Sequence, residues 1–429
     1  MKHVIETLRS IWNSRQVRDQ LLATIALTVL FRFLAHIPLF GVDVAQLRQL
    51  FASNQFLGVL NIFSGGTLAN FSLMAVGISP YITASILVQV SGLFFPKIKE
   101  MQRESDATRA QLSMITRYLT VPIAVLQSLS LLFLLRSQNL LTATAPVEFM
   151  VMILSLVAGA MVVMWIGELI TKHGVGNGIS WIIFVGIISQ IPVSFSQTWS
   201  LRSAVGSAAL LGMALGLAAL VVSVVFMQEA VRRIPIQQAR RQRGTSSYGS
   251  SMSHIPIKVT QFGVMPIIFA LPVLTLPSTL GTLLLNVPQT PGWLVAMARN
   301  WQVWFNPASP VYNTLYFILV FAFTFFSIFV YFQPKDFAED LKKSGTFVPG
   351  VRPGKPTAQL LMNVLLRVSF IGGLYLGVVA VLPLVAQNAT GINTLSIGGT
   401  GLLIVVSVVL ETMRQVQAQL VHDQYDQYL

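Results

Sequence analysis

The sequence predicts an all-α polytopic membrane protein with about ten transmembrane helices. Of its 429 residues, 54% are hydrophobic and only 10% are charged, a composition far from that of a soluble domain. Uncharged runs of about 20 residues, the length that a helix needs to cross a bilayer, recur along the whole chain. The absence of cysteine leaves neither a disulfide framework nor thiol chemistry to this chain.

Ten apolar segments have the length and composition of membrane spans. They lie near residues 20–39, 73–95, 115–135, 147–168, 178–195, 208–228, 260–285, 311–332, 363–386 and 399–420. Before them, residues 3–18 place Ile5, Leu8 and Trp12 at helical intervals among arginines, which predicts an amphipathic helix on the inner membrane surface. An even number of spans places both termini on the same side.

The basic residues between the spans indicate the orientation. If the N-terminus is cytoplasmic, the opposite side receives only Arg48, Arg136, Arg202 and Arg299. Because an excess of lysine and arginine marks the cytoplasmic side, we expect both termini to be cytoplasmic. Residues 1–19 lack a hydrophobic core of their own, so no cleavable signal peptide is expected.

The region from Gln49 to Pro96 contains no charge and is too long for one crossing. Basic residues on both flanks favour the cytoplasm, which leaves the segment near Leu57–Asn70 without a crossing of its own. We expect it to enter the membrane part-way and to turn at Gly65-Gly66, since glycine allows the backbone angles of a break. Irregular backbone at this depth is tolerated only inside protein or beside a water-filled cavity, so the segment predicts a pathway through the protein.

Two halves, 1–200 and 201–429, each carry five spans and therefore have opposite topologies. The second span of each half contains the pattern G-x-x-P-x-I, starting at Gly77 and at Gly263. Matching Gly and Pro interruptions in two halves point to a central site, although a match this short can also arise by chance between proline-containing helices.

The residues expected at this centre are aliphatic. The candidates are Ile78, Ile82, Ile179, Ile183, Ile268 and Ile404. A coupled transporter for small solutes usually carries intramembrane carboxylates or histidines, whereas here only Arg32 and Arg367 are charges plausibly within spans. The sequence contains no H-E-x-x-H and no G-x-S-x-G, so we expect neither an enzyme nor a bound metal or cofactor.

Two long basic segments are expected on the cytoplasmic side. They are the loops at about 229–258 and 333–358. Attraction to anionic headgroups explains their sign of charge. It does not explain their length, because the connection at Lys172 is short, and long loops in compact domains are usually functional. An acidic partner, such as ribosomal RNA or the acidic face of a motor protein, suits arginine-rich protrusions.

Motifs along nearly the whole chain closely resemble the bacterial SecY family of translocon subunits. They are Asn61-Ile-Phe-Ser-Gly-Gly66, Gly77-Ile-Ser-Pro-Tyr-Ile82, Gly174-x-Gly-Asn-Gly-Ile-Ser180, Arg233-Ile-Pro, Ala239-Arg-Arg-Gln242, His254-Ile-Pro-Ile-Lys258, Gly263-x-x-Pro266, Asp340-Leu-Lys-Lys-Ser-Gly345, Phe347-Val-Pro-Gly-Val-Arg-Pro-Gly354 and Met413-x-Gln-Val-Gln417. Departures occur in the 97–117 loop and at Thr245-Ser246, where the family usually has an arginine pair.

The resemblance implies a protein-conducting channel with four groups of functional residues. The plug, about residues 60–71, would include Asn61, Phe63, Ser64, Gly65, Gly66 and Thr67. The six isoleucines named above would form the pore ring. A lateral gate toward lipid would include Pro80, Ser85, Gln89, Pro266 and Leu271. The docking surface for a motor or ribosome would include Arg240, Arg241, Arg243, Lys342, Lys343 and Arg352.

The resemblance also implies partners and a location. The partners are the SecE and SecG subunits, the SecA ATPase, the ribosome, signal sequences, unfolded preproteins and membrane lipids, and the location is the bacterial inner membrane. Two alternatives are an inverted-repeat transporter, which requires a polar or ionisable central site, and a scaffold or insertase without a pore, which requires no plug. Deleting residues 60–71 distinguishes the second alternative, because only a pore would then leak ions.

Overall fold

A computed structural model describes most of the chain. The described residues are 14–42, 46–47, 67–68, 70–95, 97–98, 101, 106–138, 140–141, 145–200, 207–238, 242–243, 246–247, 252–261, 263–286, 291–307, 309–390 and 394–426. The expected amphipathic helix at 3–18 lies mostly outside them.

All ten predicted spans coincide with helices, which confirms the all-α polytopic fold. In the first half these helices are α2 (Arg15–Leu34), α5 (Ser79–Phe94), α7 (Asp106–Ser137), α8 (Pro146–His173) and α9 (Gly178–Ser200). In the second half they are α11 (Ser207–Glu229), α12 (Met265–Asn286), α14 (Pro310–Tyr331), α16 (Lys355–Thr390) and α17 (Thr394–Asp426).

Within the described residues, six helical segments are long and apolar enough to cross a membrane individually. They are Ala110–Ser137, Pro146–His173, Met265–Asn286, Pro310–Lys343, Lys355–Ala386 and Gly401–Val421. Two shorter apolar segments, Gly178–Pro192 and Ala214–Glu229, accompany them. The chain is therefore a multi-pass membrane protein whose helices differ in length and apolarity.

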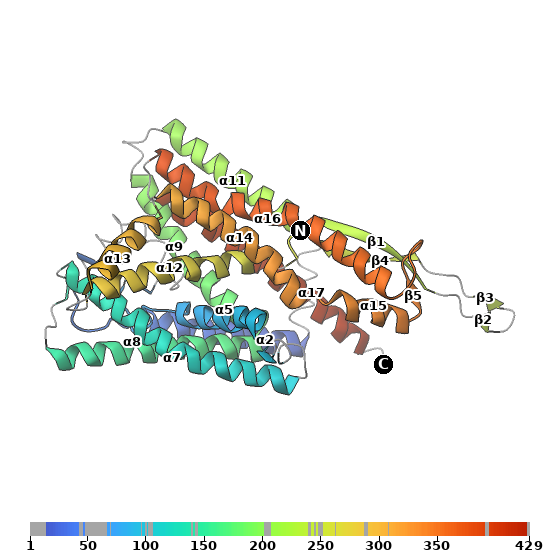
Figure 1. Cartoon of the computed structure of the whole chain (residues 1–429), viewed down its shortest axis with the longest axis horizontal. Coiled ribbons are helices and arrows are strands. Elements are labelled where there is room, and N and C mark those ends of the chain that lie inside the picture. Colours follow the sequence, from blue (N-terminus) through green and yellow to red (C-terminus); the bar gives the residue numbers. More distant parts are fainter. Residues whose placement is uncertain are drawn as a thin grey trace.

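The helices pack in two groups that meet along two seams. Figure 1 shows α7 and α8 on one side of the molecule and α11, α14 and α16 on the other. Contacts within the first group join α5 to α7 and α8 to both α2 and α9, and contacts within the second join α16 to α14 and α17. Between the groups, α12 packs on α5 and α7, and α17 packs on α9.

Two predicted spans have different limits in the structure. The helix expected at 73–95 begins only at Ser79, and the one expected at 20–39 ends at Leu34. Residues of both non-helical segments instead pair with each other: Leu39 N donates to Phe71 O at 2.8 Å, and Leu73 N to Ile37 O at 3.0 Å. Such pairing satisfies backbone groups that a helix would otherwise satisfy at membrane depth.

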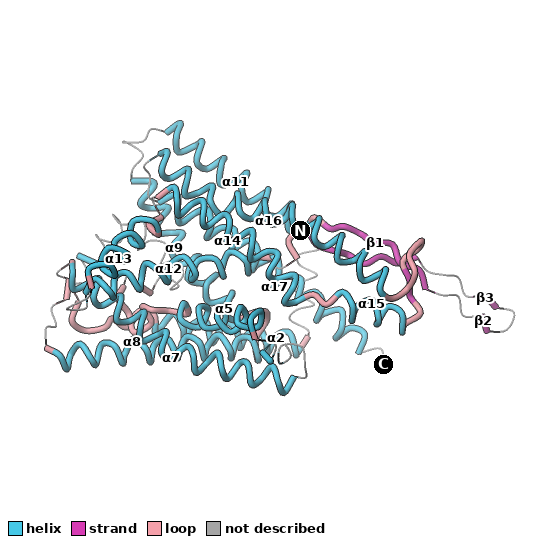
Figure 2. The backbone as a smooth tube through the Cα atoms, viewed as in Figure 1, coloured by secondary structure: helices cyan, strands magenta, loops and turns pink. Residues whose placement is uncertain are grey.

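The two segments expected as cytoplasmic loops are partly folded. Strand β1 (Val231–Gln238) pairs antiparallel with β4 (Met252–Lys258), with Ile234 opposite Ile255, and its far end pairs with β5 (Thr346–Phe347). Figure 2 shows this hairpin extending beyond the helical body beside the ends of α15 (Pro334–Lys343) and α16. The short strands β2 (Gln242–Arg243) and β3 (Ser246–Ser247) pair near its tip.

The sequence contains a signal for this hairpin that the loop interpretation overlooked. The pattern Ile-Pro-Ile occurs at 234–236 and again at 255–257, and such alternation places the isoleucines on one face of a strand. Ile234 and Ile257 are buried in a small apolar cluster with Val348, Leu361 and Leu365. The N-terminal extension of α16 thus gives the hairpin a core outside the main helical body.

The structure also contains helix α13 (Gly292–Trp304), which packs on α12 and which the sequence analysis did not predict.

Glycines allow α8 to pack closely on its neighbours. A Cβ atom at Gly159 would collide with the carbonyl oxygen of Leu73, and one at Gly178, in the Gly174–Gly178 connection, would collide with the carbonyl oxygen of Gly167. Close approach of helices through small residues is the usual way in which helices associate in membranes. These contacts hold α8 against the turn before α5 and against the start of α9.

We predict that Gly159→Ala lowers the thermal unfolding midpoint of the purified protein in detergent, because the added methyl group has no space. The cost expected for overpacking is about 1–3 kcal/mol. Gly212→Ala is the matched control, since outside its own helix backbone and chain neighbours nothing lies within 4 Å of its Cβ position, and it should leave the midpoint unchanged or raise it slightly. Equal behaviour of the two variants would contradict the packing argument.

Candidate functional site

The structure brings the six ring candidates together. Ile78, Ile82, Ile183, Ile268 and Ile404 are all buried in the largest apolar cluster, and Ile179 is half-buried against it. They come from four elements: the start of α5, α9, α12 and α17. Both halves of the chain therefore contribute aliphatic side chains to one shared centre.

Three of the four helices, α5, α9 and α17, extend this centre by one more turn than the sequence analysis predicts. Ile86, Ile187 and Val408 are buried in the same cluster, and each follows a ring candidate by four residues. Residues four apart lie on the same face of a helix. Helical periodicity was thus the signal that could have identified them.

The repeated G-x-x-P-x-I pattern produces the same local structure twice. Gly77 and Gly263 both have a positive φ, of 61° and 54°, a conformation that glycine adopts without steric cost. Two residues later α5 and α12 begin, with Pro80 and Pro266 at the second helical position, where the missing proline N–H leaves no hydrogen bond unmade. Ile82 N donates to Ile78 O, and Ile268 N to Val264 O, both at 3.1 Å. Val264 is thus the counterpart of Ile78.

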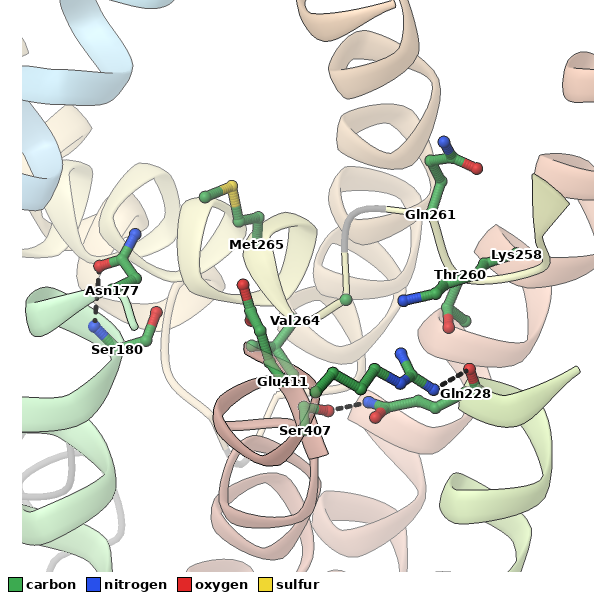
Figure 3. A pocket seen from close by; sticks show the side chains of 12 residues that line it. Asn177, Ser180, Gln228, Lys258, Thr260, Gln261, Val264, Met265, Ser407 and Glu411 are labelled. Atoms are coloured by element: carbon green, nitrogen blue, oxygen red, sulfur yellow. Dashed lines mark hydrogen bonds between the residues drawn. The ribbon is translucent and has the colours of Figure 1, made fainter. Parts of the chain in front are cut away.

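A polar cavity of about 290 Å³ lies against this aliphatic centre. Both halves line it, from the start of α9, the end of α11, the end of β4, the turn before α12, and α17. Its lining residues are Asn177, Ser180, Gln228, Lys258, Thr260, Gln261, Gly263, Val264, Met265, Ser407, Glu411 and Arg414. Figure 3 shows them around an open space. Val264 lines the cavity and belongs to the aliphatic cluster, and Ser407 lines the cavity directly before Val408 of the cluster, so the cavity borders the packed aliphatic centre.

The cavity and its rim contain positively and negatively charged side chains as well as neutral hydrogen-bonding groups. The Arg414 guanidinium pairs with the Glu229 carboxylate and donates to Gln228 O at 3.2 Å. Burial lowers the pKa of Lys258, and the neighbouring Arg414 lowers it further, while Glu229 and Glu411 oppose both effects. Among the described residues, the buried Thr260 hydroxyl has no hydrogen-bond partner. The cavity can therefore form hydrogen bonds with polar groups of several kinds.

The lateral gate candidates lie on two helices that contact each other. Pro80, Ser85 and Gln89 are on α5, where Gln89 Nε2 donates to Ser85 Oγ at 3.0 Å. Pro266 and the buried Leu271 are on α12. The contact between α5 and α12 is the seam between the two halves on this side of the centre.

Helix α7 also contributes to this seam, which the sequence reasoning missed. Gln127 Nε2 lies 3.5 Å from Thr83 Oγ1 on α5, and Ser130 Oγ donates to Thr279 O on α12 at 3.2 Å. Both distances are long for hydrogen bonds. Of the two contacts, only that of Ser130 with Thr279 crosses between the two halves, and it is weak. The sequence signal for both contacts is the occurrence of amide and hydroxyl residues in an otherwise apolar span.

Five of the six plug candidates, Asn61, Phe63, Ser64, Gly65 and Gly66, lie outside the described residues. Thr67, the sixth, is buried, and its hydroxyl donates to Met74 O at 2.6 Å. Phe71 has a φ of 41°, and its ring is buried in a second apolar cluster with Leu132 and Leu156. The C-terminal end of the expected plug is therefore anchored to α7 and α8.

The docking candidates are distributed over the folded extension. Arg240 and Arg241 lie outside the described residues, and Arg243 is in β2. Lys342 and Lys343 occupy the last turn of α15, where cations interact favourably with the helix dipole, and both are exposed. Arg352 is exposed between Gly350 and Gly354, both of which have positive φ. All described members therefore belong to the end of the molecule that carries the hairpin.

Within the described residues, no three histidine, cysteine or acidic side chains are placed to hold a metal ion.

Comparisons with known proteins agree on one family. The family model described as SecY matches residues 72–413. The protein translocase subunit SecY of Corynebacterium glutamicum is 39% identical over 432 residues, which cover 96% of each chain. A solved structure of a protein-conducting channel superposes with a TM-score of 0.67 at 18% identity, covering 95% of this chain and 93% of the other. Sec61 in a canine ribosome–channel complex gives a TM-score of 0.64 at 17% identity, with the same two coverages.

We predict that Lys258 becomes deprotonated at a lower pH than an ordinary lysine side chain. The direction follows from burial and from the nearby Arg414, both of which disfavour the charged ammonium. Acetylation of Lys258 across a pH series, read by mass spectrometry against a reference lysine peptide, measures its titration. Arg414→Gln should raise the pKa of Lys258, because it removes a cation and leaves Glu229 without its partner. An unchanged titration of Lys258 in this variant would contradict the assignment.

Proposed function

The chain belongs to the SecY family, and from this we propose that it is the pore subunit of a protein translocase. It passes unfolded secretory polypeptides across the membrane and releases apolar segments into lipid. The observation that carries the proposal is the aliphatic cluster shared by both halves beneath a polar cavity. A polypeptide first meets hydrogen-bonding groups in this cavity and then a constriction that binds no side chain specifically.

The ring of isoleucines acts as a seal that tolerates any sequence. A hydrophobic constriction excludes water and with it ions, because an ion loses its hydration shell there without compensation. Aliphatic side chains on four separate elements can move apart by the width of a peptide without breaking hydrogen bonds. Ile78, Ile82, Ile179, Ile183, Ile268 and Ile404 are the proposed ring.

The seam between α5 and α12 is the proposed lateral gate. Beside it, the contact of Ser130 Oγ on α7 with Thr279 O on α12 crosses between the halves and is long at 3.2 Å, so breaking it on opening costs little hydrogen-bond energy. A signal sequence or transmembrane segment in the pore can then partition into lipid, which favours apolar side chains. Pro80, Ser85, Gln89, Pro266 and Leu271 line this route in the proposal.

The plug is proposed to be the segment at about 60–71. The anchoring of Thr67 and Phe71 supports this assignment, because a blocking segment that leaves the pore must stay attached at one end. The phenylalanine at positive φ stores backbone strain at the position where such a segment would bend.

The folded extension with β1, β4, α15 and β5 is the proposed docking surface for the SecA motor or the ribosome. Exposed Lys342, Lys343 and Arg352 support it, since cations on a protruding surface attract acidic partners. SecE and SecG are the proposed companion subunits. The proposed location is the bacterial inner membrane, with both termini in the cytoplasm.

We predict that a translocating polypeptide contacts Ile268. A single Ile268→Cys in this cysteine-free chain, reconstituted with its partners, should form a disulfide with a cysteine in a stalled secretory chain. The disulfide should require both the substrate and the motor, because only then does the polypeptide occupy the ring. Non-reducing gel electrophoresis detects the product.

The control variant is Val222→Cys on α11, whose side chain is 68% exposed on the outer surface of the helices and should not react. Translocation that proceeds without cross-links at Ile268, Ile78 or Ile404 would overturn the pore assignment. Uptake of a small solute in place of polypeptide would favour a transporter.

We further predict that Arg352→Glu abolishes or strongly reduces SecA-driven translocation into proteoliposomes and leaves the unfolding midpoint unchanged. The side chain is exposed and its removal breaks no core contact, whereas charge reversal repels an acidic partner. The control is Arg299→Glu, an equal change at an exposed arginine of α13, on the side expected to face away from the motor. Equal loss of transport in both variants would argue against a localised docking surface.

A further inference from the structure

We propose that a cluster of four side chains positions the ring residue Ile404 and couples it to the β1–β4 hairpin. These residues, termed here the α11–α17 junction, are Gln228 and Glu229 at the end of α11 and Ser407 and Arg414 on α17. The proposal rests on the proposed function in two respects, since it treats Ile404 as a member of the pore ring and the hairpin as a surface on which a partner exerts load.

The junction ties the last turn of α11 to α17 at two heights. Gln228 Nε2 donates to Ser407 Oγ, and the Arg414 guanidinium donates to Gln228 O and pairs with the Glu229 carboxylate. Figure 3 shows the side chains of Gln228 and Ser407 pointing toward each other across the floor of the cavity. Ser407 and Arg414 are seven residues apart, about 10 Å along the helix. Two attachments at this spacing restrict both sliding and rotation of α17.

The inner attachment is shielded from water. Gln228 is 7% exposed and Ser407 is 4% exposed, and α11 is uncharged and, apart from Ser207 and Ser223, apolar up to this point. A buried hydrogen bond is strengthened by its low-dielectric surroundings, and an unpaired partner is costly there. The Gln228–Ser407 bond is therefore a specific link between two helices that otherwise contact each other through apolar side chains.

The hairpin begins immediately after the junction. Val259 N donates to Ala230 O at 3.0 Å, which closes the base of the hairpin next to Glu229. A Cβ at Gly372 on α16 would collide with Val259 O, so this base is also packed tightly against the helical body. A force on the hairpin therefore reaches Gln228 through paired backbone with no flexible linker between them.

On the other side of the junction, the next turn of α17 belongs to the ring. Ile404 precedes Ser407 by three residues and is fully buried in the aliphatic cluster, as is Val408. Close by, a Cβ at Gly401 would lie 3.0 Å from the Ile187 side chain, so α17 is in tight contact with α9. A displacement of Ser407 consequently changes how Ile404 packs against the ring residues from the other half.

A purely structural role for α11 makes a different prediction. Ser223, on the same helix, shares a hydrogen bond of 3.0 Å with the Tyr375 hydroxyl on α16. This contact also attaches α11 to the helical body, but it is exposed and involves neither the hairpin nor α17; its partner Tyr375 packs against the aliphatic cluster from α16. If α11 serves only to attach itself to the helical body, removing either contact should alter the ring geometry to the same extent. If the junction couples the hairpin to Ile404, only removal of the junction should abolish the effect of a load on the hairpin.

The test measures ring geometry with and without a load on the hairpin. The full chain carrying Ile78→Cys and Ile404→Cys is placed in lipid nanodiscs with its companion subunits, and the rate of oxidative disulfide formation is measured. The load is a Fab raised against the folded β1–β4 hairpin, so the experiment needs no translocation partner. We expect bound Fab to change the rate about fivefold, equivalent to about 1 kcal/mol.

In Ser407→Ala and in Gln228→Leu the Fab should bind with unchanged affinity and no longer alter the rate. In Ser223→Ala the Fab effect should persist in full. If either junction variant unfolds, Glu229→Gln, which changes one atom of an exposed side chain, should reduce the effect. A Fab effect that survives in the folded junction variants overturns the proposal, as does absence of any effect in the parent chain. Neither result depends on whether the protein transports polypeptides, which a separate translocation assay decides.

Discussion

The structure depends on one constraint, the absence of water at membrane depth. Every backbone group there must find a partner within the protein, so each interruption of a helix must have its own hydrogen bonds. The two G-x-x-P turns meet this requirement in the same way, with a left-handed glycine followed by a helix that begins at a proline. Because the turns occur once in each half, two helices start beside each other at the centre of the molecule.

The apolar centre follows from these paired helix starts. Side chains from α5 and α12 meet those of α9 and α17 in one aliphatic cluster, and the polar cavity lies directly against it. The cluster holds the two halves together by dispersion and exclusion of water alone. An interface of this kind can open and close again without a specific set of hydrogen bonds having to be remade, which suits a channel for polypeptides of any sequence.

The hairpin extension has a different kind of stability. Its small core of Ile234, Ile257, Val348, Leu361 and Leu365 resembles that of a soluble domain, and its base is fastened to α16 and α17. Of the described docking candidates, Lys342 and Lys343 lie on helix α15 of this extension, and Arg352 lies in the turn before α16. The paired backbone of the hairpin is what gives the α11–α17 junction its proposed significance, since a flexible loop could not convey a displacement to α17.

The sequence by itself determined the membrane class, the ten helices, the paired interruptions and the aliphatic character of the centre. Each of these depends on local composition or on spacing along the chain, which hydropathy and helical periodicity express directly. The helix limits were predicted less accurately. Helix α5 starts at Ser79 because the residues before it pair with the segment after α2, and this contact joins distant parts of the chain.

Only the tertiary structure decided the rest. The hairpin replaced an expected loop because its isoleucines find a core on α16. The aliphatic candidates lie in one cluster because helices from both halves converge there. Gln228, Ser407 and Arg414 meet only because α17, nearly two hundred residues later in the chain, packs against the end of α11. Pairings over such sequence separations are set by packing, and no local pattern encodes them.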